Sequence, residues 1–346
     1  MPVHRNNEEA SSRLALFLSR DVVERRYKAL HGGELNAAKA AEIISHLQQG
    51  QQYFRSAEAA GVLAGPLEQY YGVLAFARAI VLYRVPGARE ANLKKGHGLK
   101  ARMPEGDGLL HRIELSIEDG TFHELLDATR NAEMAGADEH GPNIGFIPNR
   151  WSAVRSLRRP AAETKFLFED LISRMPSARQ QFEEAFEKGA HCYAGRVGLM
   201  MGLLTLTVWR GRCQLPSVEQ LHTALGLGSG WHGRMTPNDS VQFECRLLDG
   251  ENALSALPNV VIDDQSNHAI IEEFPGGWAL SETCAFFAAS HTLSMLVRYH
   301  PTIWARLLSH GRGDSILPVL DKIRRSIQDD FIRLVLWELE REAPTL

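Results

Sequence analysis

The sequence has few cysteines, and they form no recognisable pattern. The 346 residues include four of them, Cys192, Cys213, Cys245 and Cys284, and no two are spaced as a CxxC pair. This spacing excludes the common zinc modules and disulfide frameworks. We therefore expect buried, reduced thiols, no metal, no cofactor and a cytoplasmic location.

Long hydrophobic runs are also absent. The longest extends from Val197 to Trp209 and contains glycine and threonine, whereas a membrane-spanning helix needs roughly 20 apolar residues. The N-terminal residues MPVHRNNEEASSRL carry charges where a signal peptide has its apolar core. We thus predict no secretion signal and no membrane association.

Neither sign of charge dominates the chain. Lys and Arg together number 38 and Asp and Glu 42, which gives a formal net charge of -4. A nucleic-acid-binding domain usually has a basic excess, so only a local segment could supply one here. With 44% hydrophobic and 23% charged residues, the composition is that of a globular protein with its own core.

Helical periodicity is typical of both ends of the chain. We predict helices over residues 11–31, from Asn36 as N-cap, from Pro66 onward, from Ser281 to Tyr299, and after Pro301 and Asp314. Residues 61–65 are predicted to form a turn. The segment LEQYYGVLAFARAIVLYR is apolar nearly all round, so we expect it at the centre of an antiparallel helical arrangement, held between the first and last helices.

Strand patterns are confined to the middle of the chain. LLHRIELSIEDGTFHEL alternates at period two, and its Asp119-Gly120 pair predicts a hairpin turn. VQFECRLL, NVVID and HAIIEEF are short strand candidates, Pro216–Leu225 is a helix candidate, and Met200–Trp209 fits either a strand or a helix. Loops are predicted at 86–108, 135–150 and 226–240, and a charged helix at 161–189.

This order of elements predicts a mainly α protein (α+β with helices dominant), with a bundle-like helical body and a small β-hairpin or sheet insertion. We expect one compact domain made of four stretches. They are an N-terminal helical part at 1–90, a basic loop plus hairpin at 91–150, a mixed α/β region at 151–275, and C-terminal helices at 276–346 that pack back on the core.

A basic segment is the most distinctive local feature. KKGHGLKAR, residues 94–102, places four permanent cations and a histidine within nine residues. Glycines flank His97, so backbone amides could approach a ligand closely. The segment is consistent with phosphate or nucleic-acid contact, although a solvated basic loop is the simpler interpretation. In the apolar helix, Arg78 needs a partner if buried, and we predict Glu68 or Glu282.

The pairs Arg25–His31 and Arg26–His31 fit the R-x(4–6)-H pattern of HEPN-type ribonucleases. In such a nuclease the arginine holds phosphate and the histidine performs acid–base work. A chain this rich in arginine and histidine contains such pairs by chance. We favour the simpler interpretation, a cationic C-terminus of a helix that interacts favourably with the helix dipole.

Four segments, in order along the chain, resemble the YaaC-like protein family. They are QYFRSAEAAGVLAGPLEQYYGVLAFARAIVL, GHGLKAR, the segment at 113–123, and SETCAFFAASHTLSMLVRYHPTIWARLL. The resemblance implies a helical fold with a small β insertion, and it carries over no catalytic residue. The positions that match the family's motif residues are Tyr71, Gly72, His97, Gly98, Arg298, Tyr299, Pro301 and Trp304.

Two functional hypotheses follow. In the first, the chain is a helical binding or assembly protein that acts with a protein partner or as a homo-oligomer, for instance in a defence or stress system. In the second, it is an RNA- or nucleotide-directed enzyme, such as a HEPN-like nuclease, with His97 as acid–base and Arg102 or Arg298 holding phosphate. The catalytic residues are unknown, with His97 and Arg298 as candidates.

The ligand-binding candidates are those that match the family motifs or carry the local positive charge. They are Tyr71, Lys95, His97, Arg102, Arg298 and Tyr299. We expect the basic segment and the Arg-Tyr end of the last long apolar helix to meet near the Tyr-Tyr-Gly helix and to bind an anionic ligand or nucleic acid. This requires His97 and Arg298 to lie within roughly 15 Å of each other.

Overall fold

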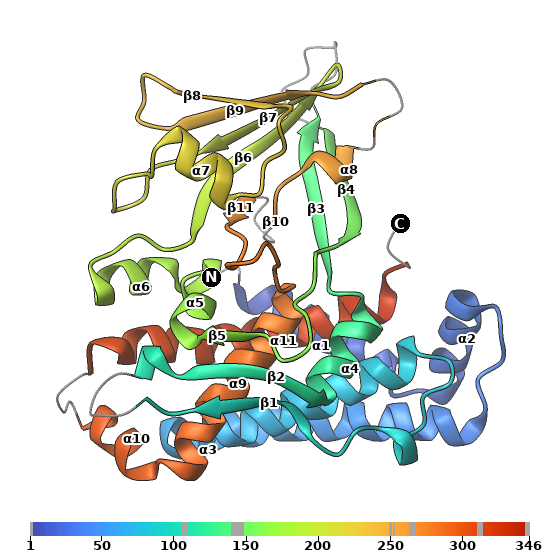
Figure 1. The fold of residues 1–346 in the computed structure, drawn as a ribbon. Helices are drawn as coiled ribbons and strands as arrows, with labels where there is room; N and C mark the ends of the chain where they lie inside the picture. Colours follow the sequence, from blue (N-terminus) through green and yellow to red (C-terminus); the bar gives the residue numbers. More distant parts are fainter. Residues whose placement is uncertain are drawn as a thin grey trace. The chain divides into compact units, whose positions relative to one another are not determined.

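The computed structural model describes residues 3–104, 110–139, 149–248, 251, 253–262, 268–309 and 314–342. The chain divides into two compact units (Figure 1). Unit 1 comprises Met1–Asn131, Pro160–Leu171 and Leu280–Ala343. Unit 2 comprises Ala132–Arg159 and Ile172–Ala279 among the described residues.

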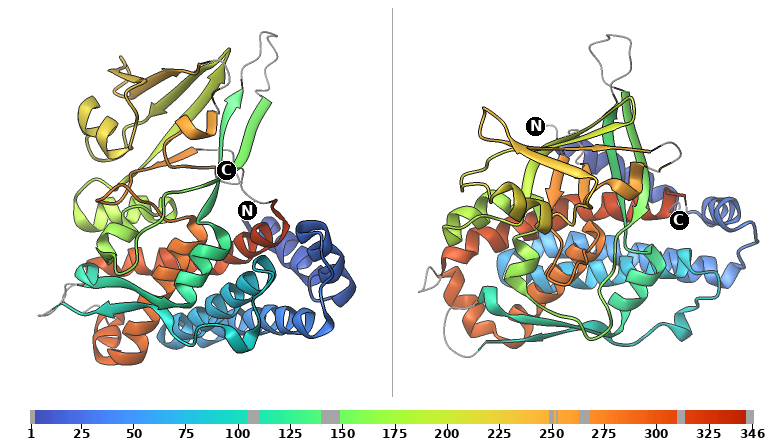
Figure 2. Two further views of the ribbon diagram at one scale, coloured as in Figure 1. Left: turned by 45° about the vertical axis from the view of Figure 1, so that its right-hand side comes forward. Right: turned by 45° about the horizontal axis from the view of Figure 1, so that its top comes forward.

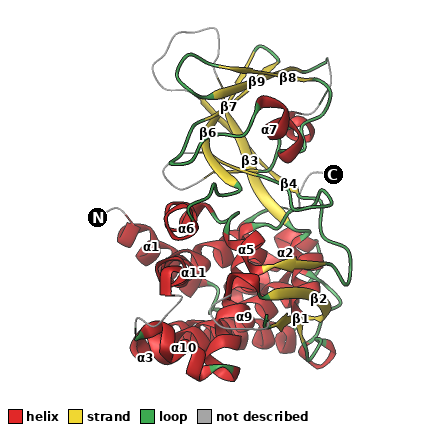
Figure 3. Ribbon diagram, turned by 60° about the vertical axis from the view of Figure 1, so that its left-hand side comes forward, coloured by secondary structure: helices red, strands yellow, loops and turns green. Residues whose placement is uncertain are grey.

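Unit 1 consists mostly of helices, which Figure 3 shows in red. They are α1 (Val3–Leu16), α2 (Arg20–His31), α3 (Ala37–Arg84), α4 (Thr121–Thr129), α9 (Glu282–Tyr299), α10 (Pro301–Leu308) and α11 (Leu317–Glu340), with 3-10 turns η1 (Glu90–Asn92), η2 (Leu110–Arg112) and η4 (Asp314–Ile316). Strands β1 (His97–Arg102), β2 (Glu114–Gly120) and β5 (Lys165–Leu167) form an antiparallel sheet in the order β1-β2-β5.

The element α3 is a pair of antiparallel helices that meet at Gly61. Gly61 has φ 65° and ψ -161°, a backbone conformation that is in practice open only to glycine. The two halves approach so closely that a Cβ on Gly72 would lie 2.4 Å from the Phe54 ring, and one on Gly50 would lie 2.7 Å from the Phe76 ring. The predicted turn at 61–65 and the antiparallel packing are confirmed.

The second half of α3 is the buried centre of unit 1. Val73, Phe76 and Ile80 are fully buried, and helices α2, α4, α9 and α11 pack against α3. The prediction that the tyrosine-rich segment is a buried rod held between the first and last helices is confirmed. At the start of α3, the Asn36 side chain accepts a hydrogen bond from the Lys39 backbone N–H at 2.8 Å, as predicted for an N-cap.

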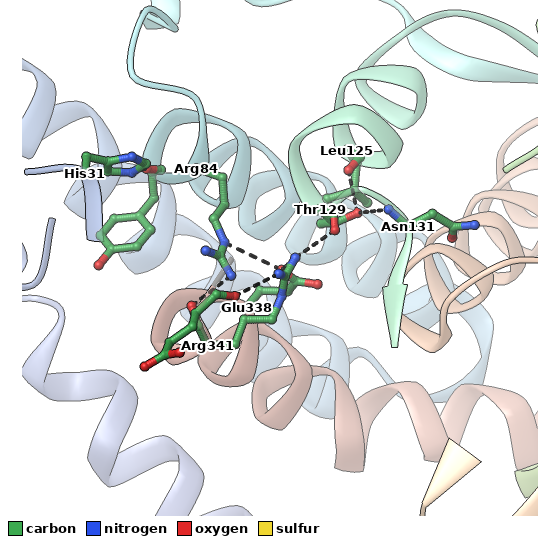
Figure 4. Close-up of polar contacts among 9 residues, drawn as sticks. His31, Arg84, Leu125, Thr129, Asn131, Glu338 and Arg341 are labelled. Atoms are coloured by element: carbon green, nitrogen blue, oxygen red, sulfur yellow. Dashed lines mark hydrogen bonds and ion pairs between the residues drawn. The ribbon is translucent and has the colours of Figure 1, made fainter. Parts of the chain in front are cut away.

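A buried ion-pair network lies where α3 and α11 end (Figure 4). The Glu338 carboxylate is fully buried and accepts a hydrogen bond from Nε of Arg341 at 2.8 Å. Arg84 Nε lies 3.8 Å from the same carboxylate. Arg341 also donates to the Thr129 carbonyl at 2.7 Å, and Arg84 donates to the Arg341 carbonyl at 3.1 Å. The network ties the ends of α3, α4 and α11 together.

Unit 2 is built around an eight-stranded sheet with the path β10-β11-β6-β7-β9-β8, and β3 pairs with β4 and β6. Figure 2 shows β3 and β4 as a long two-stranded ribbon. The strands are β3 (Ala132–Glu139), β4 (Asn149–Ser156), β6 (Cys192–Met200), β7 (Leu203–Val208), β8 (Trp231–Met235), β9 (Val241–Arg246), β10 (Val260–Ile262) and β11 (His268–Ile271). The short helices are η3 (Pro176–Ala178), α6 (Arg179–Phe186), α7 (Val218–Ala224) and α8 (Ala253–Ala256), while α5 (Phe168–Ile172) crosses the boundary between the units.

The predicted predominance of helices with a β component is confirmed, but the sheets are far larger than the small insertion we predicted. The predicted loops at 86–108 and 226–240 contain β1 and β8. The one predicted at 135–150 overlaps β3 and β4, and its part at 140–148 lies outside the described residues. β1 and β8 each pair with only one neighbour and leave several side chains exposed, so both lack the apolar alternation that marks a strand.

Two further predictions are wrong in detail. Asp119-Gly120 is not a hairpin turn, because β2 pairs with the preceding strand β1 and the chain then enters α4. Residues 161–189 are not one helix but β5, α5, η3 and α6 in turn. The predicted elements α7, α9, α10, β9, β10 and β11 are confirmed. Among the described residues, no helix combines the length and apolarity that a membrane crossing requires.

Candidate functional site

Five residues of unit 1, which we call the His97 cluster, come together from α3, β1 and α9. Tyr70 and Arg78 are eight residues apart on α3, and His291 and Arg298 are seven apart on α9, so each pair lies about two turns apart on one helix face. His97 is the first residue of β1. Gly98, with φ 80°, passes so close to Phe122 that a Cβ there would clash. The glycine therefore lets β1 seat His97 against the helices.

Hydrogen bonding fixes the His97 ring. The Tyr70 hydroxyl lies 2.7 Å from Nδ1 of His97. Burial raises the pKa of Tyr70, so its hydroxyl stays protonated and can donate to Nδ1 or accept from it. Where the hydroxyl donates, the neutral His97 ring carries its own proton on Nε2. The His291 ring packs against both, with centroids 5.8 Å from His97 and 5.4 Å from Tyr70.

The charged groups of the cluster are all positive. Burial lowers the pKa of His97, and the charges of Arg298 and Arg78 lower it further. Burial also lowers the pKa of His291 to about 3, with a contribution from His97. The imidazoles are therefore neutral near pH 7, and the two guanidiniums carry the charge. The charge of Arg298 acts on His97, and the predicted separation of these two residues stays a prediction.

Arg78 lacks the carboxylate that we predicted for it. Glu282 instead lies 3.6 Å from Arg333. Among the residues that the structure describes, no ion pair includes Arg78, with Glu68 or any other carboxylate, and its buried Nε has no hydrogen-bond partner. The side chain is half-buried. The predicted pairing is thus wrong, and α3 holds a partly buried positive charge without compensation.

Most other predicted ligand-binding residues lie around the cluster. Tyr71 is half-buried and its ring lies 5.6 Å from that of Tyr53 and 6.0 Å from that of Tyr70. Tyr299 is 54% exposed, and the Arg298 guanidinium lies 4.9 Å from its ring centre. Lys95 is exposed, two residues before His97.

Arg102 is not brought to the cluster. It lies five residues after His97 on the same strand, which corresponds to roughly 16 Å. Its side chain lines a hollow on the outer face of the small sheet, together with Lys100, Glu114 and Lys165. Glu114 forms an ion pair with Lys165 at 3.3 Å, so this hollow has mixed charge.

The R-x(4–6)-H residues serve packing. The Nε2–H of His31 donates to the Tyr83 carbonyl at 2.9 Å, and its ring lies 4.3 Å from that of Tyr27. Arg26 lies 3.7 Å from Glu340. His31 thus joins α2 to the end of α3. Among the described side chains, no group of three or more His, Cys, Asp or Glu is arranged to hold a metal ion.

Sequence reasoning missed His291 as a member of the cluster. The available signal was a histidine inside the apolar helix AFFAASHTLSML, seven residues before Arg298. A fully buried histidine at that spacing shares a helix face with the arginine. Recognising His291 as part of a site also requires knowing that β1 packs against α9, which the sequence of the helix does not show.

Comparison with known proteins identifies a family. The family model described as YaaC-like Protein matches residues 10–339, nearly the whole chain. No curated protein and no solved structure matches the chain. The match agrees with the resemblance of the four sequence segments to this family.

Proposed function

Since the chain belongs to the YaaC-like protein family, we propose a function from its own residues: unit 1 binds a small ligand with a phosphate or carboxylate group at the His97 cluster. The observation that carries this proposal is the half-buried guanidinium of Arg78, which has no carboxylate partner among the described residues and lowers the pKa values of His97 and His46. A buried charge without a partner destabilises a fold. A bound anion supplies that partner.

The donors around Arg78 suit a planar or tetrahedral anion. A guanidinium offers paired N–H groups that match carboxylate and phosphate oxygens. In this proposal the Tyr70 hydroxyl donates to Nδ1 of His97, which leaves the Nε2–H of His97 to donate to the ligand. Arg298 supplies a second charge at the exposed side, over the Tyr299 ring. In this proposal His97 is a hydrogen-bond donor to the ligand, and Tyr299 offers an exposed face to an aromatic group of the ligand.

Titration with inorganic phosphate, pyrophosphate and ADP tests the proposal. We expect at least one probe to bind in calorimetry and to raise the unfolding temperature. Arg78→Gln should weaken binding about tenfold or more, since charge-assisted hydrogen bonds contribute about 1.5–3 kcal/mol. Without the anion, Arg78→Gln should not destabilise the protein, because it removes an unpaired charge.

Arg102→Gln is the matched control, because Arg102 is an exposed arginine in the neighbouring hollow. It should leave the affinity within about twofold, as expected where salt screens an exposed charge. The proposal fails if the two variants lose affinity equally, if none of the three probes binds, or if Arg78→Gln alone unfolds the protein.

An apolar groove beside Gly61 supports a second proposal, self-association through this face of unit 1. The groove has a volume of about 410 Å³ and is lined mainly by apolar side chains from α3, α9, α10 and α11, among them Leu293, Trp304 and Leu317. Next to it, Val62 and Leu63 are 46% and 62% exposed. Exposed apolar side chains beside an apolar groove mark interaction sites.

The occupant that we propose is a second copy of the chain. A protrusion and a groove on one face can fit each other across a two-fold axis, so that Leu63 of each copy enters the groove of the other. We expect sedimentation over roughly 1–100 µM to show a monomer–dimer equilibrium. Leu63→Glu should abolish the dimer, whereas Leu16→Glu, at another exposed leucine of unit 1, should not. A monomer at every concentration contradicts this proposal.

A further inference from the structure

Unit 2 contains a cavity of about 470 Å³ that the proposed function does not use. Its lining residues come from α6, from the segment that leads into β6, from residues 211–216, from α7 and from the segment after β11. Five of them carry the argument: Arg179, His191, Tyr193, Cys213 and Glu272. All five belong to unit 2 and are independent of the His97 cluster.

A histidine–carboxylate pair forms part of the cavity wall. Nδ1 of His191 lies 2.5 Å from one oxygen of Glu272, and the Tyr193 hydroxyl donates to the other oxygen. Burial by itself would raise the pKa of Glu272, but the hydrogen bonds from His191 and Tyr193 lower it. The carboxylate is therefore ionised, and the Nδ1–H of His191 donates to it.

This arrangement leaves Nε2 of His191 as a proton acceptor. The side chain of His191 is 44% exposed, whereas that of Glu272 is 9% exposed. The backbone supports the pair, since the Glu272 N–H donates to the His191 carbonyl at 2.9 Å and Arg174 donates to the Glu272 carbonyl at 3.1 Å. In enzymes, a buried carboxylate often fixes the tautomer and orientation of a histidine that acts as a general base.

A thiol and a cation line the same cavity. Cys213 is half-buried, unlike the buried Cys192, Cys245 and Cys284. Its Cβ lies 3.7 Å from the position that a Cβ on Gly189 would take, two residues before His191. Arg179, at the start of α6, is half-buried, and among the described residues no ion pair includes it. The cavity therefore combines a base, a nucleophile and a cation, and the carboxylate of Glu183 lines it as well.

We propose that this cavity is a second active site, which hydrolyses an ester or thioester of an acid that carries a further anionic group. Nε2 of His191 takes the Cys213 proton, and the thiolate adds to the carbonyl carbon. The tetrahedral intermediate expels the alcohol or thiol, which receives the proton from His191. Water, deprotonated by His191, then attacks the acyl-cysteine and releases the acid and the free thiol. Arg179 holds the anionic group. Glu272 and Tyr193 are positioning residues.

The rate of Cys213 alkylation by iodoacetamide tests the coupling between thiol and imidazole. Mass spectrometry of the full chain should place the label on Cys213 first, because the other three cysteines are buried. At pH 7 the wild type should react about tenfold faster than His191→Gln, as expected where an adjacent base raises the thiolate fraction. Glu272→Gln should also slow the alkylation of Cys213. His232→Gln, which replaces an exposed histidine of unit 2, should leave the rate unchanged.

Hydrolysis tests the substrate class. We expect turnover of a p-nitrophenyl ester with a terminal carboxylate, loss of turnover in Cys213→Ser, and an acyl adduct on Cys213 in the wild type. Arg179→Gln should lower kcat/KM about tenfold for that ester, and by less for the uncharged p-nitrophenyl acetate, since a lost charge-assisted contact costs about 1.4 kcal/mol or more.

Two results would overturn the proposal. One is an alkylation rate that is the same in the wild type and in folded His191→Gln. The other is turnover of the carboxylated ester that persists in Cys213→Ser, or that does not exceed the reaction in buffer. Binding of phosphate at the His97 cluster has no bearing on either result, so the two proposals stand or fall separately.

Discussion

Replacing Glu338 by alanine should lower the free energy of unfolding by about 3–5 kcal/mol, the range measured when one partner of a buried ion pair is removed. The carboxylate is fully buried between Arg341 and Arg84 (Figure 4). Without it, two buried guanidiniums face each other with no opposing charge. Burial and the neighbouring Arg341 lower the pKa of Arg84 to about 10, which means that the site disfavours the charged form of Arg84 even with Glu338 present.

Urea unfolding measures this effect, and Glu340→Ala is its matched control. Glu340 lies two residues further along α11 and forms ion pairs with Arg13 and Arg26 at the surface. Exposed pairs contribute about 0–1 kcal/mol, so this control should change little. If Glu338→Ala lowered the free energy of unfolding by no more than about 1 kcal/mol, the Arg84–Glu338–Arg341 network would not stabilise the fold.

Acidification from pH 7 to pH 4 should destabilise the protein, with His291 as the largest single contributor. Its pKa is about 3 in the folded chain and about 6.5 in an unfolded one. Above pH 6.5 both states are neutral at this residue. Between pH 6.5 and the pKa of the folded chain, this residue is protonated in the unfolded chain but not in the folded one. The free energy of unfolding therefore falls as the pH falls, by up to about 1.4 kcal/mol per pH unit.

His291→Phe should reduce this dependence on pH. Phenylalanine retains an aromatic ring against Tyr70 and His97 and removes Nδ1, which is buried without a hydrogen-bond partner. Part of the dependence should remain, because burial also lowers the pKa of His31, His46 and His97. An identical slope in His291→Phe would contradict the assignment.

The buried centre of unit 1 could be predicted because the information is local. The second half of α3 is apolar on every face, and Pro66 and Gly61 mark where it begins. Strand β1 could not be predicted, because Lys100 and Arg102 face solvent and the strand is held in place by its pairing with β2. An exposed strand with one neighbour carries little hydrophobic pattern of its own.

The candidate sites show the same limit. His97 and Arg298 stood out by charge and motif, whereas the missing partner of Arg78 depends on where Glu282 points, more than 200 positions later in the chain. His191 and Glu272 are 81 residues apart. Pairings of this kind are set by sheet topology, which periodicity does not specify.

The glycine-hinged pair of helices in α3 has a consequence during synthesis. Its two halves meet within a span of roughly 50 residues, so they can associate as soon as Arg84 has left the ribosome. The helices that cover them, α9 and α11, begin only at Glu282 and Leu317. At about 5–20 residues per second this interval lasts roughly 10–40 s. During that time the nascent chain carries an uncovered apolar surface.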